Sequence, residues 1–370
     1  MSVPRFIFID TCIIENEGYR FESDKMSAFV AAAKAKSTIL LLPDPTKREI
    51  LKHIKRNAED VVSALEEAKR KAPFLKKWKE WPIKKDIFML TYELHRIARK
   101  EWEDFLANFT LITLDYTDIK MPEIMDWYDK QVPPFGPGKS KEFPDALSFA
   151  IVLQYARKNN CTVAIISRDK DFHNAAVRYP EVLAFESIAA FTQALIESDA
   201  HVKVVRDLLG KDISVIKEAI SREFSSLAFY PGGDTVGDGT VEDVDVIGVS
   251  IKDSKVIALG DKQCTVAFEA IVEYSAYVDY ETEVEAADGE AHWTVSLNRE
   301  GNVVDEAFVS GIIKIHINQA WNGVDGVDLV SIDKDDIEVT SEPDDSDDSY
   351  EPDPSDYYEN YSGPEDDEDY

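Results

Sequence analysis

Acidic side chains recur in this sequence where a predicted strand ends or a predicted helix begins. The apolar run Phe6–Ile9 has the pattern of a strand buried on both faces, and Asp10 follows it directly. In an open parallel sheet, ligands bind beyond the carboxyl ends of the strands, so Asp10 is a candidate site residue. The later acids of this kind are Glu49, Asp145, Asp169 and Asp171.

Carboxylates that converge on one sheet edge can form a cation site. They repel one another and raise each other's pKa unless a cation lies between them. Mg²⁺ and Mn²⁺ prefer oxygen ligands and suit such a set. A cation held there can activate water and stabilise the pentacovalent phosphate and its leaving oxygen. The acids therefore predict metal-dependent phosphodiester hydrolysis, although each of them alone also has an explanation as a turn residue, a helix cap or a solvated charge.

The elements needed to position these acids alternate between strand and helix over residues 5–197. Such an order predicts an α/β fold, with a parallel sheet flanked by helices. Strands are expected over residues 5–10, 37–42, 109–114, 162–166 and 182–185. Helices are expected over residues 24–36, 44–58, 117–130, 142–158 and 187–197, and after Asp169. We assign residues 1–198 to one domain, with a helical insertion at 59–108 that is broken near Pro73 and Pro82.

The remainder of the chain changes character twice. Residues 199–240 are expected to form a helical linker, with one helix over 199–225, and a Gly-rich loop. Short alternating runs over residues 241–340 predict an all-β domain, a small sandwich or barrel. Residues 341–370 carry almost no aliphatic side chains, so we expect a disordered acidic tail.

Negative charge is distributed unevenly along the 370 residues, which carry a net charge of −31. Residues 1–225 hold 35 Lys and Arg against 34 Asp and Glu, a net charge of +1. Residues 226–340 have a net charge of −18, and residues 341–370 have one of −14. The overall acidity therefore does not exclude a nucleic-acid partner for the first 225 residues.

Basic and aromatic residues between positions 47 and 102 have two interpretations. They form either a solvated helical face with aromatic core residues, or a track for a phosphate backbone with tryptophans that stack on bases. The candidates for nucleic-acid contact are Lys47, Arg48, Lys52, Lys76, Lys77, Lys141 and Arg168. The acidic tail either solubilises the chain or folds back on these basic helices.

Cysteine usage and hydropathy favour a cytoplasmic protein without a membrane partner. Cys12, Cys161 and Cys264 are too far apart in sequence for a zinc signature or a disulfide framework. No apolar run reaches the roughly 20 residues of a membrane span. The N-terminus lacks the layout of a signal peptide.

Four segments resemble the acidic motifs of the PIN-domain family, which consists largely of metal-dependent ribonucleases. They are Phe8–Thr11, the helix with Glu49, Pro144–Leu147, and Ser167–Phe172, of which the last is the most specific. The resemblance covers residues 3–197. It implies that the metal is bound by Asp10, Glu49, Asp145 and Asp169, that Asp171 is a supporting or alternative ligand, and that Thr11 and Ser167 supply neighbouring hydroxyl groups.

The chain departs from the common family pattern in its long helical stretch, in Pro144 where Gly is frequent, and in its C-terminal β-rich region and tail. Larger bacterial PIN proteins with such a region look more similar to it than the small toxin nucleases do. The leading hypothesis is a Mg²⁺- or Mn²⁺-dependent endoribonuclease with toxin-like chemistry. The alternatives are a DNA or structure-specific nuclease, and a non-catalytic nucleic-acid-binding or regulatory protein on a PIN-like scaffold. A homodimer stays open.

Overall fold

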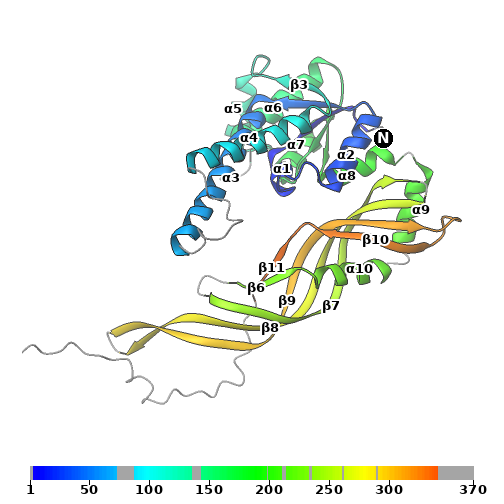
Figure 1. The fold of residues 1–370 in the computed structure, drawn as a ribbon. Coiled ribbons are helices and arrows are strands. Elements are labelled where there is room, and N and C mark those ends of the chain that lie inside the picture. The colour runs from blue at the N-terminus through cyan, green and yellow to red at the C-terminus, as the bar shows by residue number, and fades with distance from the viewer. Residues whose placement is uncertain are drawn as a thin grey trace, which may run out of the picture. The chain divides into compact units, whose positions relative to one another are not determined.

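The structure is a computed structural model (Figure 1). It describes residues 3–72, 87–135, 143–197, 199–210, 214–232, 236–260, 262–288 and 291–340, with the backbone alone for 87–89, 236–238, 281–288, 291–298 and 328–330. The chain divides into two compact units. The first comprises Met1–Ile220, Ile251–Ala270 and Ser310–Ile332, and the second comprises Ser221–Ser250, Ile271–Val309 and the chain from Asp333 on. The predicted site residues all belong to the first unit.

A five-stranded parallel sheet lies at the centre of the first unit. Its strands are β1 (Phe6–Ile9), β2 (Ile39–Pro43), β3 (Thr110–Leu114), β4 (Val163–Ile166) and β5 (Val182–Phe185), in the order β3-β2-β1-β4-β5. Every neighbouring pair is parallel, which confirms the predicted fold class. The chain moves outward from β1 to β3 on one side and from β4 to β5 on the other. The strand order therefore reverses between β1 and β4, and such a switch point is where open α/β sheets bind ligands.

Ten described helices accompany the strands. They are α1 (Thr11–Asn16), α2 (Asp24–Ala35), α3 (Asp44–Lys71), α4 (Ile87–Leu106), α5 (Met121–Asp129), α6 (Phe143–Lys158), α7 (Lys170–Arg178), α8 (Ile188–Ile196), α9 (Ala200–Leu209) and α10 (Ser214–Phe224). α1 was not predicted, because six residues are too few to show a helical period. α3 continues well past residue 58, since no Gly or Pro interrupts it after Pro45. The single helix expected over 199–225 is wrong: α9 ends at its C-cap Gly210, and α10 is separate.

Two apolar clusters cover the parallel sheet, one on each face. Ile7 and Ile9 of β1 belong to the cluster that α1, α2, α3, α4 and α8 help to form. Phe8, between them, belongs to the cluster of α5, α6 and α7. Successive side chains of a strand point to opposite faces, so a continuous apolar run such as Phe6–Ile9 is what a doubly covered strand requires.

The C-terminal region is all-β, as predicted, and its described strands lie in two sheets, of four and of two strands. The strands β7 (Val236–Leu259), β8 (Gln263–Asp288), β9 (Ala291–Ile317) and β10 (Val324–Ile332) form one four-stranded sheet with antiparallel neighbours β9 and β10 (Figure 1). β6 (Ala228–Pro231) and β11 (Asp336–Val339) pair in parallel. The sequence suggested short strands because polar residues and glycines interrupt its runs, yet the strands continue through them. At Gly311 a side chain would collide with the carbonyl oxygen of Ser331, so glycine permits close pairing there.

Trp102 belongs to the core, so it is not available to stack on bases. It is 3% exposed, and its ring centroid lies 5.6 Å from that of Phe21 and 5.6 Å from that of Phe105. Trp78 and Trp81 lie outside the described residues. For this position the structure therefore favours the interpretation of an aromatic core residue.

We expect Trp102→Ala to lower the free energy of unfolding by about 3–5 kcal/mol, because it leaves a cavity in this aromatic cluster. Tyr92→Ala on the same helix is the control, since Tyr92 is 57% exposed, and it should change the free energy by no more than about 0.5 kcal/mol. Urea unfolding of both variants measures the difference. Equal effects of the two substitutions would contradict the assignment of Trp102 to the core.

Candidate functional site

Asp10 lies at the switch point of the sheet. Its backbone N–H donates to the carbonyl oxygen of Ile166 at 3.0 Å, which extends the pairing of β1 with β4 by one residue. Its extended backbone then forms the N-cap of α1. The residue is only 6% exposed. The central strand thus places a buried carboxyl group at the point of the sheet edge where the strand order reverses.

Two side chains donate to the same oxygen of Asp10. Ser167, directly after β4, donates its hydroxyl to Oδ2 at 2.7 Å, and the Cys12 thiol donates to Oδ2 at 2.8 Å. The Sγ atom of Cys12 also lies 3.6 Å from Oγ of Ser167. These contacts orient the carboxyl group of Asp10. Ser167 was predicted as a supporting hydroxyl, and its role at a metal site stays a prediction. Cys12 was not predicted, and its place two residues after Asp10 was the only signal.

Burial raises the pKa of Asp10, and the negative charge of Glu49 adds to this rise, while the hydrogen bonds from Cys12, Ser167 and the Thr11 backbone oppose it. Burial, together with the charge of Asp10, also raises the pKa of the Cys12 thiol to about 12, so the thiol stays protonated and acts as a donor. Among the described residues, no Lys, Arg or His side chain forms an ion pair with Asp10. A buried carboxylate without a positive partner is costly and favours a proton or a cation.

Glu49 is attached to this centre through Thr11. The Thr11 hydroxyl donates to Oε2 of Glu49 at 2.8 Å, and Thr11 itself is buried directly after Asp10. Glu49 is half-buried in the second turn of α3. Thr11 therefore holds the Glu49 carboxylate beside Asp10, which is why its charge affects the pKa of Asp10.

Asp169 is attached to the centre through Ser167. The Asp169 backbone N–H donates to Oγ of Ser167 at 3.0 Å, so one hydroxyl links the loop after β4 to Asp10. Asp169 is the N-cap of α7, and its Oδ1 accepts the backbone N–H of Asp171 at 2.8 Å. The ring of His173 is fixed by Nε2, 2.7 Å from the carbonyl oxygen of Ser167.

Asp145 lies in the first turn of α6, as predicted. A buried hydroxyl pair, Thr46 with Ser148 at 2.8 Å, joins α6 to α3 near the start of both helices. Glu49 follows Thr46 by three residues and Asp145 precedes Ser148 by three. Across the part of the chain that the structure describes, no three His, Cys, Asp or Glu side chains form a group that could hold a metal ion. Hydrogen bonds through Thr11 and Ser167 thus connect Asp10 to Glu49 and to the Asp169 loop. The predicted acids do not, however, converge on one point in the described structure.

The candidates for nucleic-acid contact have different surroundings. Lys47, Arg48 and Lys52 are exposed on the first turns of α3, where Arg48 pairs with Asp44. Arg168 donates to Oδ1 of Asn16 at 2.7 Å and pairs with Glu269 at 2.8 Å. Lys76, Lys77 and Lys141 lie outside the described residues, as does the acidic tail.

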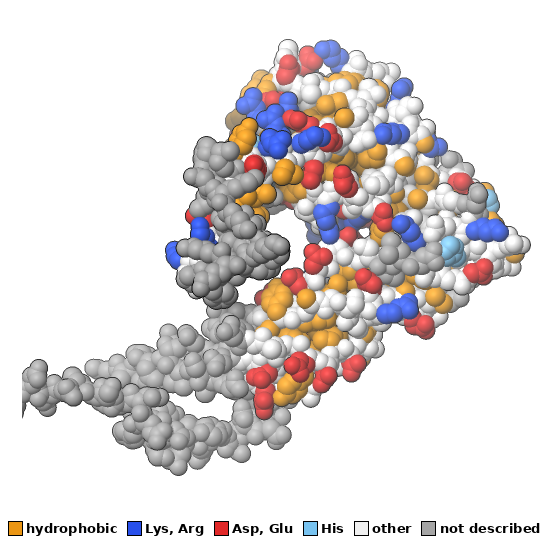
Figure 2. Space-filling view, in the orientation of Figure 1, with side chains coloured by type: hydrophobic (Ala, Val, Ile, Leu, Met, Phe, Trp, Pro, Cys, Tyr) orange, Lys and Arg blue, Asp and Glu red, His pale blue; other side chains and the backbone are white. Residues whose placement is uncertain are grey.

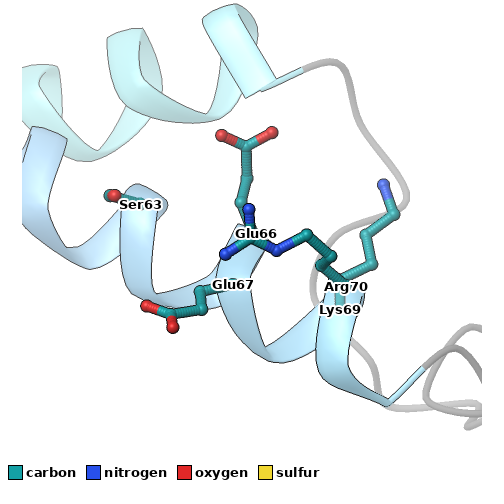
Figure 3. Close-up of a pocket in the computed structure, with 5 residues that line it drawn as sticks. All are labelled: Ser63, Glu66, Glu67, Lys69 and Arg70. Atoms are coloured by element: carbon teal, nitrogen blue, oxygen red, sulfur yellow. The ribbon is translucent and has the colours of Figure 1, made fainter.

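The basic helices carry their own counter-charges. In α3 and α4, ion pairs between residues four apart join Arg48 to Asp44, Lys55 to Glu59, Lys71 to Glu67, Arg99 to Glu103 and Lys100 to Asp104. Figure 2 likewise shows basic and acidic side chains interspersed on the visible face. A surface hollow near the C-terminal end of α3 is also lined by both acidic and basic side chains. They are Glu66, Glu67, Lys69 and Arg70, beside Ser63 (Figure 3). Glu66 is roughly 25 Å along the helix from Glu49, so this hollow is separate from the site.

Comparison with known protein families gives a match in the N-terminal part of the chain. Residues 7–172 match the family model described as PIN domain. This part of the chain is a PIN domain, which confirms the resemblance carried by the four motifs, and PIN domains are generally nucleases. No curated protein and no solved structure matches the chain. Among the described helices, none is long and apolar enough to cross a membrane.

We expect Asp10→Asn to stabilise the metal-free protein at neutral pH. The folded-state pKa of Asp10 is raised, so the folded state binds this proton more tightly than the unfolded chain does. Stability of the wild type should therefore fall as pH rises from the unfolded pKa through the folded one, and the neutral amide avoids that loss. Urea unfolding in EDTA should show a gain of about 1 kcal/mol at about pH 7 and a smaller one at about pH 4, near the unfolded-state pKa of an Asp side chain.

Asp104→Asn is the matched control, because Asp104 is an exposed acid on α4. It should show no gain that grows with pH. If Asp10→Asn is destabilised equally at both pH values, the result contradicts the claim that burial of the ionised Asp10 carboxylate is unfavourable.

Proposed function

We propose that this protein is a Mg²⁺- or Mn²⁺-dependent endoribonuclease that acts in the cytoplasm. The observation that carries the proposal is the Asp10 carboxylate, which is buried at the switch point of a PIN-domain sheet beside a second carboxylate, Glu49. Within the described part of the chain, no positive side chain pairs with Asp10. A divalent cation would supply the missing positive charge.

The donors at this site suit a hard divalent cation. Carboxylate oxygens are the ligands that Mg²⁺ and Mn²⁺ prefer, and a protonated thiol such as that of Cys12 does not compete with them. The residues that would hold the cation are Asp10, Glu49, Asp145 and Asp169, with Asp171 as a supporting ligand. When bound, the cation supplies the acidity that activates water and the positive charge that stabilises the leaving oxygen.

The protein's own residues orient the carboxylates for this task. Ser167 and Cys12 hold the Oδ2 atom of Asp10 by hydrogen bonds. Thr11 holds the Oε2 atom of Glu49. Fixing ligand orientation in this way commonly changes metal affinity by about 10–100-fold.

RNA is the proposed substrate. Lys47 and Lys52 lie exposed on α3, two residues before Glu49 and three residues after it, where they can meet the phosphates of a bound strand. Arg168, which follows Ser167 directly, is a third candidate for phosphate contact, although its guanidinium group pairs with Glu269. The choice of RNA over DNA rests on the resemblance to ribonucleases of the PIN family, and a homodimer stays a prediction.

We expect the purified full chain to cleave internal bonds of single-stranded RNA in the presence of Mn²⁺ or Mg²⁺, and to lose this activity in EDTA. Asp10→Asn and Asp169→Asn should each lower the rate at least about 100-fold, because each removes a proposed ligand. Gel assays with matched RNA and DNA strands measure the cleavage and the choice of sugar. Asp104→Asn should keep the wild-type rate.

Cleavage at the wild-type rate by both Asp10→Asn and Asp169→Asn would contradict the proposed metal site. Cleavage of the DNA strand alone would show that the substrate is DNA, and the proposed metal site would still stand. A folded wild type that neither cleaves nor responds to metal would favour the alternative of a non-catalytic binding protein on this scaffold.

A further inference from the structure

Helices α1 and α3 contact each other through two side-chain pairs at matching positions. The first pair is Thr11 with Glu49, described above, and the second is Glu15 with His53, in which Oε1 of Glu15 contacts Nδ1 of His53. The second pair lies four residues after the first in both helices. Residues four apart share one face of a helix, so the two pairs join the same face of α1 to the same face of α3.

The second pair is less exposed to solvent than the Lys55–Glu59 ion pair of α3. The side chain of His53 is 16% exposed and that of Glu15 is 40% exposed, whereas Lys55 and Glu59 are 64% and 52% exposed. Arg56, one turn later in α3, also approaches Glu15, with Nη2 3.8 Å from Oε1. Glu15 therefore draws two side chains of α3 toward the end of α1.

Tyr19, three residues after the end of α1, packs beside these groups. Its backbone φ of 57° is unusual for a large side chain and has to be maintained by surrounding contacts. Among the described residues its hydroxyl is buried without a hydrogen-bond partner. Burial raises the pKa of Tyr19, the charges of Glu15 and Glu49 add to the rise, and Arg56 opposes it. The side chains that join α1 to α3 thus form one compact group next to Glu49.

From the two matching pairs we infer that Glu15 and His53 are positioning residues, which fix the spacing between the carboxylates of Glu49 and Asp10. α1 starts immediately after Asp10, so its position is tied to that residue. Glu49 belongs to α3, and the contacts of α3 with α1 determine how far Glu49 lies from Asp10. Thr11 holds the Glu49 carboxylate itself, and the second pair prevents α3 from turning or sliding about that single contact.

This inference rests on the proposed metal site, because spacing matters only if the two carboxylates bind a common cation. A positioning role and a purely structural role of Glu15 and His53 predict different effects on stability and on metal affinity. A partly exposed hydrogen bond or ion pair stabilises a fold by only about 0–1.5 kcal/mol, so loss of the second pair should change global stability little. A metal site depends more strongly on the spacing of its ligands, so metal affinity should change more.

The test is calorimetric titration of the full-length protein with Mn²⁺, without RNA. We expect Thr11→Val to weaken Mn²⁺ binding about tenfold and His53→Ala about threefold or more. The double variant should lose less Mn²⁺ affinity than the product of the two single losses, because both substitutions act through Glu49. His53→Gln should recover most of the affinity, since its amide can still donate to Glu15.

Lys55→Ala is the matched control, because Lys55 lies on α3 and pairs only with exposed Glu59 in the described contacts. It should leave Mn²⁺ affinity unchanged. Wild-type affinity in folded His53→Ala, or effects of Thr11→Val and His53→Ala that multiply fully, would overturn the positioning role while leaving the proposed function intact. Absence of Mn²⁺ binding by the wild type would overturn both.

Discussion

The buried carboxyl group of Asp10 is the constraint on which the rest of the site depends. β1 is the central strand of the sheet, so its carboxyl end lies at the one point where the strand order reverses. Burial there raises the pKa of Asp10, and the nearby charge of Glu49 raises it further. Two donors orient the group, but they do not replace a positive charge. The fold thus maintains an unfavourable carboxylate at the edge of the sheet, and a metal-binding role, as proposed above, would account for this cost in stability.

Small polar side chains connect the surroundings of Asp10 to the neighbouring helices by hydrogen bonds. Thr11 joins Asp10 to α3 through Glu49, and Ser167 joins Asp10 to the loop that leads into α7. A further hydroxyl pair, Thr46 with Ser148, joins α3 to α6. Each bridge lies at or near the start of a helix, where a side chain is positioned by the end of a strand. Several parts of the chain that are distant in sequence are therefore tied to one edge of one sheet.

The sequence was sufficient for the parts of this account that depend on local pattern. Apolar runs such as Phe6–Ile9 predicted the parallel strands, and acids at their ends predicted the edge that carries Asp10. It was insufficient where the determining contact is distant. Nothing local shows that Glu15 meets His53, or that Trp102 packs against Phe21. The long β strands were missed for a related reason, because pairing with neighbours carries them through residues that interrupt their alternating pattern.

Crystals of the full-length protein soaked with Mn²⁺ offer the most direct measurement of the central claim, since anomalous scattering locates the cation independently of activity. We expect a peak within about 2.5 Å of a carboxylate oxygen of Asp10, shared with Glu49 or Asp169, and we expect its loss in Asp10→Asn. Mn²⁺ bound only elsewhere, or a peak that persists unchanged in Asp10→Asn, would contradict it.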